Sequence, residues 1–551
     1  MAVEQSSTSI DKEDHSSKQR CCTRVFHWLM WIALLSYALG RFVTGEVSTS
    51  LPKQLPYMFS VDVRRSPYGV DRKWDLSDEE WREGRLFMVK AWPWLVLHSV
   101  VGRLLGHAAP SLVPHYHAAY SLLFVSLELG LSSAAFFVVE HAVFFALAWL
   151  GLPVLSYLVA FLMVSHFDLF GYDLFTIVLE SHGHSSYFVT VVAFYWTVLR
   201  CLSFCMDFNS RSKDNKMAAN RRGRQRLPSY WKTLSYAVYL PPLFLGPVQN
   251  YDDFLSSAEK PRPAFTLREF VTCVAGLLRT AVHFLLMDLM CHYFYSSALK
   301  KAPHLIARLD LTSLVGYGLA LNMLFFMKYR IQYGLSGGVA RIEGHQLPAP
   351  PKCIFRSHLC SHFWRYFDHG LHLWIKKYIY LPIVGSKRKT HRKLLAVAVA
   401  FASVWVWHGM TSAVTFWASL SFLGIAVELV LAQIRRLDCC KTFESKHIDP
   451  GQRRFIKAVL GSPHYLLTIF ACMFYLADME ITTMLFNRVI LGFPLPLVPV
   501  LVALYFGAHV SQDAMDCEAS GAAKEATAGR TLPLFNQEAA EHSTFQPLEV
   551  L

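Results

Sequence analysis

The stretch "FWRYFDHGLHLWIKKYIY", from Phe363 to Tyr380, places charged groups inside a segment that is otherwise apolar and aromatic. Its apolar residues recur at helical spacing, which predicts a helix. Within it, Asp368 lies between aromatic residues, with basic residues on both sides. Ionisable groups in an apolar helix are costly at membrane depth and usually face a functional interior. This stretch therefore predicts a polar site inside an apolar helical protein.

The rest of the chain is as apolar as this stretch. Of 551 residues, 53% are hydrophobic and only 17% are charged, against about 25% charged in soluble domains. Thirteen apolar segments recur from Val25 to Phe506, and many reach the roughly 20 residues that a helix needs to cross a bilayer. We predict an all-α polytopic membrane protein with about ten transmembrane helices plus re-entrant segments. The strict alternation of a membrane β-barrel is missing.

The net charge of +13 has a topological explanation. Basic residues gather between apolar segments, at 211–226, 387–393 and 435–457, as the positive-inside rule describes for cytoplasmic loops. We therefore expect no nucleic-acid partner and a cytosolic N-terminus. The polar ends, 1–24 and 509–551, are predicted to be disordered tails around a transmembrane catalytic domain at 25–508.

The twelve cysteines form no CxxC pair and no disulfide framework. Cys21, Cys22, Cys439 and Cys440 lie in two pairs beside basic residues and apolar segments. Such cysteines are either S-palmitoylated or unmodified thiols, and the sequence leaves both open.

A continuous helix over the opening stretch would have two functional faces. One face would carry Asp368 with its apolar neighbours Trp364, Phe367 and Leu371. The other would be a basic stripe of Arg365, His369, His372 and Lys376. A basic stripe binds either anionic lipid headgroups or an anionic cosubstrate, and spacing alone does not decide between them.

A second polar residue interrupts the apolar run "VWVWHGMTSAVTFW", where His408 precedes Gly409. Histidine can accept a proton near neutral pH, so His408 is a candidate general base for acyl transfer. No GxSxG motif accompanies it, which favours direct transfer over an acyl-serine intermediate. A hydrogen-bonded structural histidine, or a transporter that uses Asp368 and His408 as a proton relay, remains an alternative.

Together these segments resemble the membrane-bound O-acyltransferase (MBOAT) superfamily. The resemblance rests on "FWRYFDHGLHLWIKKYIYLPIVGS", on "WVWHGM" about forty residues later, on "YLPPLFLGPVQNYDDF" at 239–254 and on "LRCLSF" at 199–204. Within the superfamily the chain is most similar to the hedgehog acyltransferase branch. The resemblance implies an MBOAT-type helical bundle around a central tunnel.

The resemblance also implies residue roles. His408 and Asp368 match the two catalytic residues, Trp364 matches a residue bordering the acyl-CoA path, and Cys353 matches a haem-iron ligand, so haem b is a possible cofactor. The basic face would bind the CoA phosphates through Arg365, His372 and Lys376. Glu428 matches an acid of that branch, for which a structural helix-pairing role is equally plausible. The chain departs from the family pattern at Val384 and Met410.

The implied function is transfer of palmitate from palmitoyl-CoA to the N-terminal cysteine of a secreted hedgehog-type protein. Its expected location is the endoplasmic reticulum or Golgi membrane, among membrane lipids. Three alternatives stay open: an acyltransferase of the same fold that acts on a lipid, sterol or protein serine, a proton-coupled transporter, and a non-catalytic regulator. The transporter reading would be favoured by an inverted repeat, and the sequence contains none that we detect.

Overall fold

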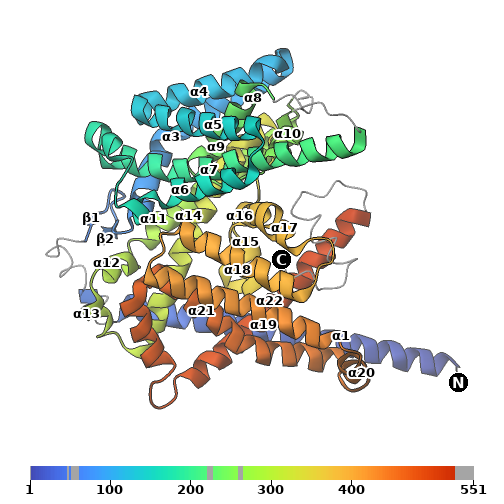
Figure 1. The fold of residues 1–551 in the computed structure, drawn as a ribbon. Coiled ribbons are helices and arrows are strands. Elements are labelled where there is room, and N and C mark those ends of the chain that lie inside the picture. Colours follow the sequence, from blue (N-terminus) through green and yellow to red (C-terminus); the bar gives the residue numbers. More distant parts are fainter. Residues whose placement is uncertain are drawn as a thin grey trace.

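The computed structural model describes residues 2–45, 47, 49–50, 61–219, 228–258 and 265–527, with side chains described over 21–45, 47, 49–50, 61–210, 228–258 and 265–521. Helices dominate these residues, and one two-stranded antiparallel hairpin accompanies them (Figure 1). The predicted all-α polytopic fold is thereby confirmed.

The first part of the chain forms the hairpin and six long or medium helices. Their bounds are α1 Ala2–Thr44, β1 Val63–Arg65, β2 Lys73–Asp75, α3 Glu79–Ala108, η2 Pro110–Leu112, α4 Val113–Glu128, α5 Leu131–Leu150, α6 Pro153–Phe170 and α7 Thr176–Ala219. Short helices then precede two long ones: α8 Tyr230–Ala237, α9 Leu240–Leu243, α10 Tyr251–Ala258, α11 Leu267–Met290, α12 Ser296–Lys300, α13 Pro303–Ile306 and α14 Leu311–Glu343.

The second part begins with a run of short helices that contains the opening stretch of the sequence. These are η3 Ile354–Arg356, α15 Cys360–Phe367, α16 His369–Ile375, the π-helix η4 Lys376–Tyr380 and α17 Leu381–Val384. Longer helices complete the fold: α18 Thr390–Trp407, α19 Ser412–Arg435, α20 Asp438–His447, α21 Pro450–Val489 and α22 Leu497–Thr527.

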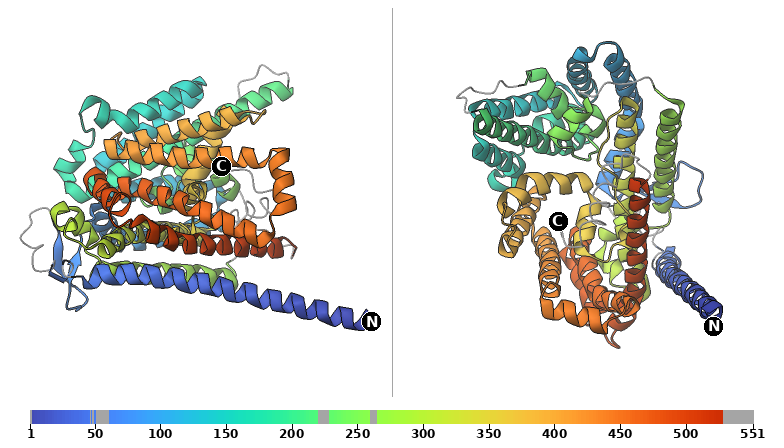
Figure 2. Two further views of the ribbon diagram at one scale, coloured as in Figure 1. Left: turned by 90° about the horizontal axis from the view of Figure 1, so that it is seen from below. Right: turned by 90° about the vertical axis from the view of Figure 1, so that its right-hand side faces the viewer.

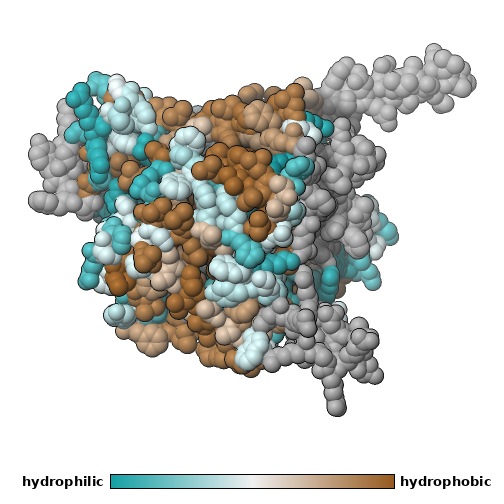
Figure 3. Space-filling model, turned by 90° about the horizontal axis from the view of Figure 1, so that it is seen from above, coloured by the Kyte–Doolittle hydropathy of each residue, from teal (hydrophilic) through white to brown (hydrophobic). Residues whose placement is uncertain are grey.

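Nine helices in the described part of the chain are long and apolar enough to cross a membrane. This is close to the predicted ten, although α3 and α18, both of which contain predicted apolar segments, are not among the nine. Large apolar side chains are exposed on the outside, for example Leu131 at 75% and Val154 at 81%. Figure 3 shows such side chains covering much of one face. Exposed apolar side chains on this scale fit a protein surrounded by lipid.

The helix α14 lies at the centre of the bundle and packs against α1, α3, α11 and α21. The hairpin lies at one end of the long helices, and the N-terminal end of α1 and α20 lie at the other (Figures 1 and 2). The helix α20 carries part of the basic cluster at 435–457. The hairpin thus lies at the end opposite the N-terminus and α20, and the cytosolic N-terminus stays a prediction.

Local sequence signals explain where several helices begin. Asp78 precedes α3 and accepts the Trp81 N–H through its side chain, and Thr266 forms a capping box with Glu269 at the start of α11. Both arrangements satisfy N–H groups that have no partner inside a helix.

Helices run through both predicted tail boundaries. The backbone of α1 is helical from Ala2, so most of the predicted tail 1–24 lies within a helix. At the other end α22 continues past residue 508, and Asp513 pairs with Arg24 at 3.3 Å and with Arg454. Polar composition alone could not reveal these partners. Residues 528–551 lie outside the described residues, and 25–508 as the catalytic unit stays a prediction.

Candidate active site

His408 follows the last residue of α18 and begins a tight turn into α19. The N–H groups of His408 and Met410 donate to the carbonyls of Val404 and Trp405 at 3.1 and 3.2 Å. Gly409 and Met410 have φ of +84° and +47°. Positive φ is easily adopted only by glycine, so Gly409 suits this turn. The turn holds the half-buried His408 side chain at the end of α18.

A cavity of about 800 Å³ is lined by His408 and Gly409 and also by residues 77–80, which follow the hairpin. Its walls come mainly from α3, α6, α7, α14 and α21, and residues 77–80 and Lys300 contribute polar groups. The volume lies in the range of small-molecule sites, about 300–1,000 Å³. The Tyr475 hydroxyl lies 3.4 Å from His408 Nδ1, which leaves Nε2 as the ring nitrogen available to a substrate.

Aromatic rings surround His408, and one of them, Tyr475, also lines the cavity. The rings of Trp417 and Tyr475 each lie 5.0 Å from the imidazole and stack on each other at 4.5 Å. Trp364, predicted to border the acyl-CoA path, lies 5.1 Å from Trp417 and 5.0 Å from Phe401. Trp417 thus lies between the two residues and contacts both Trp364 and His408.

The prediction of a continuous helix over the opening stretch is wrong, because the backbone breaks at Asp368. This residue has φ of −123° and ψ of 85°, between the end of α15 and the start of α16. Its carboxylate accepts the Leu371 N–H at 3.0 Å and so caps α16. Aspartate is a strong capping residue, which explains the break. Faces derived from uninterrupted helical spacing therefore do not apply across Asp368.

Asp368 and His408 lie on opposite sides of an aromatic layer. Phe367 stacks on Phe325 at 4.9 Å, and Phe325 lies 5.8 Å from Tyr475, the ring beside His408. Asp368 does not line the cavity described above. The two predicted catalytic residues are neighbours through this layer and make no direct hydrogen bond.

Tyr333, which sequence reasoning missed, holds Asp368 in place. Its buried hydroxyl donates to Asp368 Oδ2 at 2.6 Å. A Cβ on Gly246, in the tyrosine-proline-glycine segment, would lie 2.8 Å from the Tyr333 ring. A Cβ on Gly370 would lie 2.4 Å from the Val248 carbonyl oxygen. The resemblance motifs therefore meet around Asp368 through close contacts that only glycine permits.

The basic stripe predicted to bind CoA phosphates is mostly buried. Arg365 is 5% exposed and His372 is 7% exposed, while Lys376 is half-buried at the start of η4. None of the three lines the cavity beside His408. His372 Nε2 is buried and has no hydrogen-bond partner among the described residues. The predicted basic stripe is thus corrected, because the break at Asp368 places Arg365 and His372 on two separate helices, where both side chains are buried.

Lys377, the next basic residue, forms part of a polar cluster instead. Its ammonium group lies 2.8 Å from Asp207 on α7 and 2.8 Å from Asp252 on α10. The Tyr378 hydroxyl donates to Asp207 at 2.8 Å. These partners are more than 100 residues away in the sequence, so spacing could not identify them.

Cys353, the predicted haem ligand, borders a hole of only about 30 Å³. Lys352 and Glu518, which pair at 2.6 Å, form part of its wall. Burial raises the pKa of the Cys353 thiol, whereas haem ligation uses the thiolate. Small-molecule sites are about 300–1,000 Å³. The residues present here do not fit a haem, and the haem prediction finds no support.

A different group of residues has the types that bind metals. Ligand atoms of His98, His117 and Glu343 lie within 4.8 Å of one another, and all three are buried. However, His117 Nε2 contacts Glu343 Oε1 at 2.5 Å, and the Tyr239 hydroxyl donates to Oε2 at 2.9 Å. Two ligands of a tetrahedral zinc ion lie about 3.4 Å apart, given its bond lengths. The geometry is therefore that of a hydrogen-bonded link between α4 and α14, to which Tyr239 before α9 also contributes.

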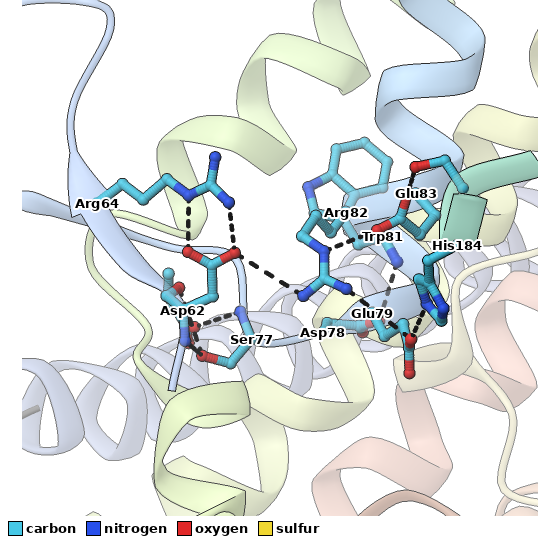
Figure 4. Close-up of polar contacts among 11 residues, drawn as sticks. Asp62, Arg64, Ser77, Asp78, Glu79, Trp81, Arg82, Glu83 and His184 are labelled. Carbon is cyan, nitrogen blue, oxygen red and sulfur yellow. Dashed lines mark hydrogen bonds and ion pairs between the residues drawn. The ribbon is translucent and has the colours of Figure 1, made fainter. Parts of the chain in front are cut away.

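Charged side chains form a network beside the hairpin, as Figure 4 shows, and Glu79 of this network lines the cavity. Arg82 Nε lies 2.8 Å from Glu83, and its terminal nitrogens lie 3.8 Å from Asp62 and from Glu79. Glu79 also contacts His184 Nε2 at 2.6 Å. This network thus joins the segment beside the hairpin to α3 and α7.

Glu428 has the structural role that the sequence left open. It accepts the Ser361 N–H at 3.2 Å and the Ser361 hydroxyl, and it pairs with His464 at 2.6 Å. These contacts join α19 to α15 and α21. Glu428 does not line the cavity.

Comparison with known proteins identifies relatives of one kind. The model of the MBOAT, membrane-bound O-acyltransferase family matches residues 145–455, more than half of the chain. Protein-cysteine N-palmitoyltransferase Rasp of Drosophila melanogaster is 26% identical over 85% of this chain and 90% of its own length. Two proteins of Mus musculus also match. Protein-cysteine N-palmitoyltransferase HHAT is 28% identical over 57% and 63%, and its HHAT-like protein is 26% identical over 89% and 84%.

Proposed function

The chain belongs to the membrane-bound O-acyltransferase family, and on this premise we propose that it transfers palmitate from palmitoyl-CoA to the N-terminal cysteine of a secreted hedgehog-type protein. Three similar proteins carry names of protein-cysteine N-palmitoyltransferases or of a protein like them. We place the reaction at the endoplasmic reticulum membrane, with the acceptor on the lumenal, hairpin side. The observation that carries the proposal is that His408 lines the cavity of about 800 Å³.

His408 acts as the general base in this proposal. The attacking nitrogen of the acceptor gives a proton to Nε2 as the C–N bond forms and the thioester C–S bond breaks. The imidazolium then returns the proton to the sulfur of CoA, which leaves as a thiol. A positioned base of this kind contributes about 10²–10⁴-fold to the rate. We expect the Trp417 and Tyr475 rings to shield the thioester from water, which would limit its hydrolysis.

Asp368 acts on the donor side of the aromatic layer. With one oxygen bound to Tyr333 and the other to the Leu371 N–H, its carboxylate is fixed in direction. We propose that it orients the thioester of palmitoyl-CoA and that Trp364 forms the adjacent wall. Of the basic residues proposed to contact the CoA phosphates, Lys376 is the most accessible, and Arg365 and His372 are buried.

The test uses purified protein, labelled palmitoyl-CoA and a hedgehog peptide with an N-terminal cysteine. We expect His408→Ala to lower transfer at least 100-fold without changing the melting temperature. His447→Ala, an exposed histidine at the end of α20, is the matched control and should transfer label like the wild type. Full transfer by His408→Ala would refute the mechanism.

A second arm tests the acceptor. A lysolipid, a sterol and a peptide with an N-terminal serine replace the cysteine peptide. The proposal expects label only on the cysteine peptide. Transfer to the lipid or sterol with none to the peptide would reassign the acceptor class and leave the acyltransferase assignment intact.

A further inference from the structure

The last turn of α6 forms one wall of the cavity directly beside the catalytic turn. His166 and Asp168 both line the cavity that contains His408 and Gly409. The Asp168 carboxylate oxygens lie 3.8 and 3.9 Å from the position that a Cβ atom on Gly409 would occupy. A negatively charged group thus lies within contact distance of the backbone next to the base.

Most other carboxylates around the cavity already have partners in the protein. Asp78 and Glu80 pair with Lys328 at 3.0 and 2.7 Å, and Glu79 contacts His184 (Figure 4). Asp173 accepts the Tyr187 hydroxyl at 2.7 Å.

Asp168 differs from all of them. Its side chain is exposed to the cavity, and no hydrogen bond or ion pair joins it to another described residue. The carboxylate nearest the catalytic turn is therefore the one for which no hydrogen bond or ion pair within the described residues is found. A cationic group of a bound substrate could pair with the Asp168 carboxylate.

His166, two residues earlier, supplies a second unsatisfied group in the same wall. Its side chain is 6% exposed, and its Nδ1 lies 2.9 Å from the Met163 carbonyl oxygen. A carbonyl can only accept, so Nδ1 carries the hydrogen and Nε2 of the neutral ring is an acceptor. Nε2 is buried and has no hydrogen-bond partner in the described part of the chain. Leaving a buried polar atom unpaired is costly, which favours a donor from a ligand.

We propose that Asp168 and His166 form the binding site for the free amino terminus of the acceptor polypeptide. Asp168 holds the α-ammonium group beside His408, and His166 Nε2 accepts a second hydrogen from the terminal cysteine, on its nitrogen or its sulfur. This inference rests on the proposed function and narrows it. It makes the acceptor an amine with a positive charge, whereas a phosphate-bearing lysolipid would be repelled by the same carboxylate.

Every proton and bond of the acyl transfer is accounted for when the amino terminus binds at this site. An α-ammonium group has a pKa of about 7.7–8.0 in solution, so the acceptor arrives mostly charged and first releases one proton to water. The resulting amine attacks the thioester carbonyl and gives a second proton to His408. The amide forms, the C–S bond breaks, and CoA leaves as the thiol with the proton from His408. The net products are the amide, CoA thiol and one proton.

The experiment compares two inhibitors of acyl transfer to the labelled acceptor. One is a peptide that begins with S-methylcysteine, whose free amine lets it compete as an alternative acceptor. The other is the same peptide without the α-amino group, which competes without reacting. The wild type should bind the first about tenfold more tightly, since a charged hydrogen bond is lost in the second. Asp168→Asn should bind both about equally, with an unchanged KM for palmitoyl-CoA. His166→Gln should raise the acceptor KM while keeping the acyl-CoA KM.

Asp71→Asn is the control, because it removes the same charge from an exposed residue of the hairpin turn outside the cavity. It should keep the wild-type preference. If Asp168→Asn keeps the tenfold preference, this inference is refuted, and the proposed function stands because the wild type still acylates the peptide. If the wild type acylates no peptide and labels a lipid instead, both are refuted. A melting curve for each variant shows that a loss of preference does not come from unfolding.

Discussion

Removing the Tyr333 hydroxyl should impair the proposed role of Asp368 without changing that residue itself. In Tyr333→Phe, Asp368 Oδ2 loses the 2.6 Å hydrogen bond and keeps no other donor among the described residues. Oδ1 retains the Leu371 N–H at 3.0 Å. The ring itself stays, so the contact with Gly246 is preserved. The change therefore isolates one hydrogen bond to a buried carboxylate.

The expected loss of kcat/KM follows from the strength of that hydrogen bond. A hydrogen bond to a charged group contributes about 1.5–3 kcal/mol, and each 1.4 kcal/mol corresponds to about tenfold. If Asp368 orients the donor in the transition state, kcat/KM should fall about 10- to 150-fold. The melting temperature should fall as well, because the carboxylate stays buried with one oxygen unsatisfied.

The assay measures initial rates of palmitoyl transfer over a range of palmitoyl-CoA concentrations. Tyr317→Phe is the matched control, because Tyr317 is a fully buried tyrosine of the same helix whose hydroxyl has no hydrogen-bond partner among the described residues. Its removal should leave both rate and stability close to wild type. The double variant with Asp368→Asn should be little worse than Asp368→Asn alone, because the two residues act as a unit. Wild-type kinetics in Tyr333→Phe would refute this reasoning, and so would fully additive losses.

Three further predictions concern packing, pairing and pH. Gly370→Ala should unfold or strongly destabilise the protein in a thermal melt, because its Cβ would lie 2.4 Å from the Val248 carbonyl oxygen; a wild-type melting temperature would contradict this. Glu428→Gln should cost about 1–3 kcal/mol of stability and leave kcat of the folded protein unchanged, whereas a loss of kcat alone would place this acid in the chemistry. Burial raises the pKa of Asp75 to about 6, above about 3.9 in unfolded chains, so the folded state binds the proton more readily. Stability from this group should therefore rise by up to roughly 3 kcal/mol as the pH falls from 7 to 4, and Asp75→Asn should remove that rise in melting temperature.

The sequence predicted the two polar centres of the site because each breaks an apolar pattern. His408 and Asp368 are ionisable residues in apolar, aromatic stretches. In the fold His408 lies 5.0 Å from the Trp417 ring and Asp368 accepts the Tyr333 hydroxyl, while their catalytic roles stay a prediction. The helix break at Asp368 was not predicted. A capping aspartate and an aspartate inside a helix have the same neighbours in sequence, and only the backbone angles distinguish them.

The sequence could not predict contacts between residues of distant segments, and the reason is physical. Tyr333, the residue that orients Asp368, is one of many aromatic residues in an apolar helix and carries no spacing signal. The same holds for Lys377, which resembled a surface lysine and pairs with Asp207 and Asp252 in the fold. Helical periodicity describes one helix at a time, whereas these contacts depend on how helices cross.

The two sides of the aromatic layer are built from different parts of the chain, and this has a consequence for specificity. Around Asp368 the backbone segments touch so closely that Gly246 and Gly370 admit no side chain, so most substitutions there should damage the fold. Around the acceptor wall, Asp168 lies in the last turn of a helix and Asp78 follows the hairpin. Residues at helix ends and loops can change without repacking a core. We therefore expect donor chemistry to be fixed by the close-packed side, and acceptor choice to be altered by substitutions at Asp168 that leave the melting temperature unchanged.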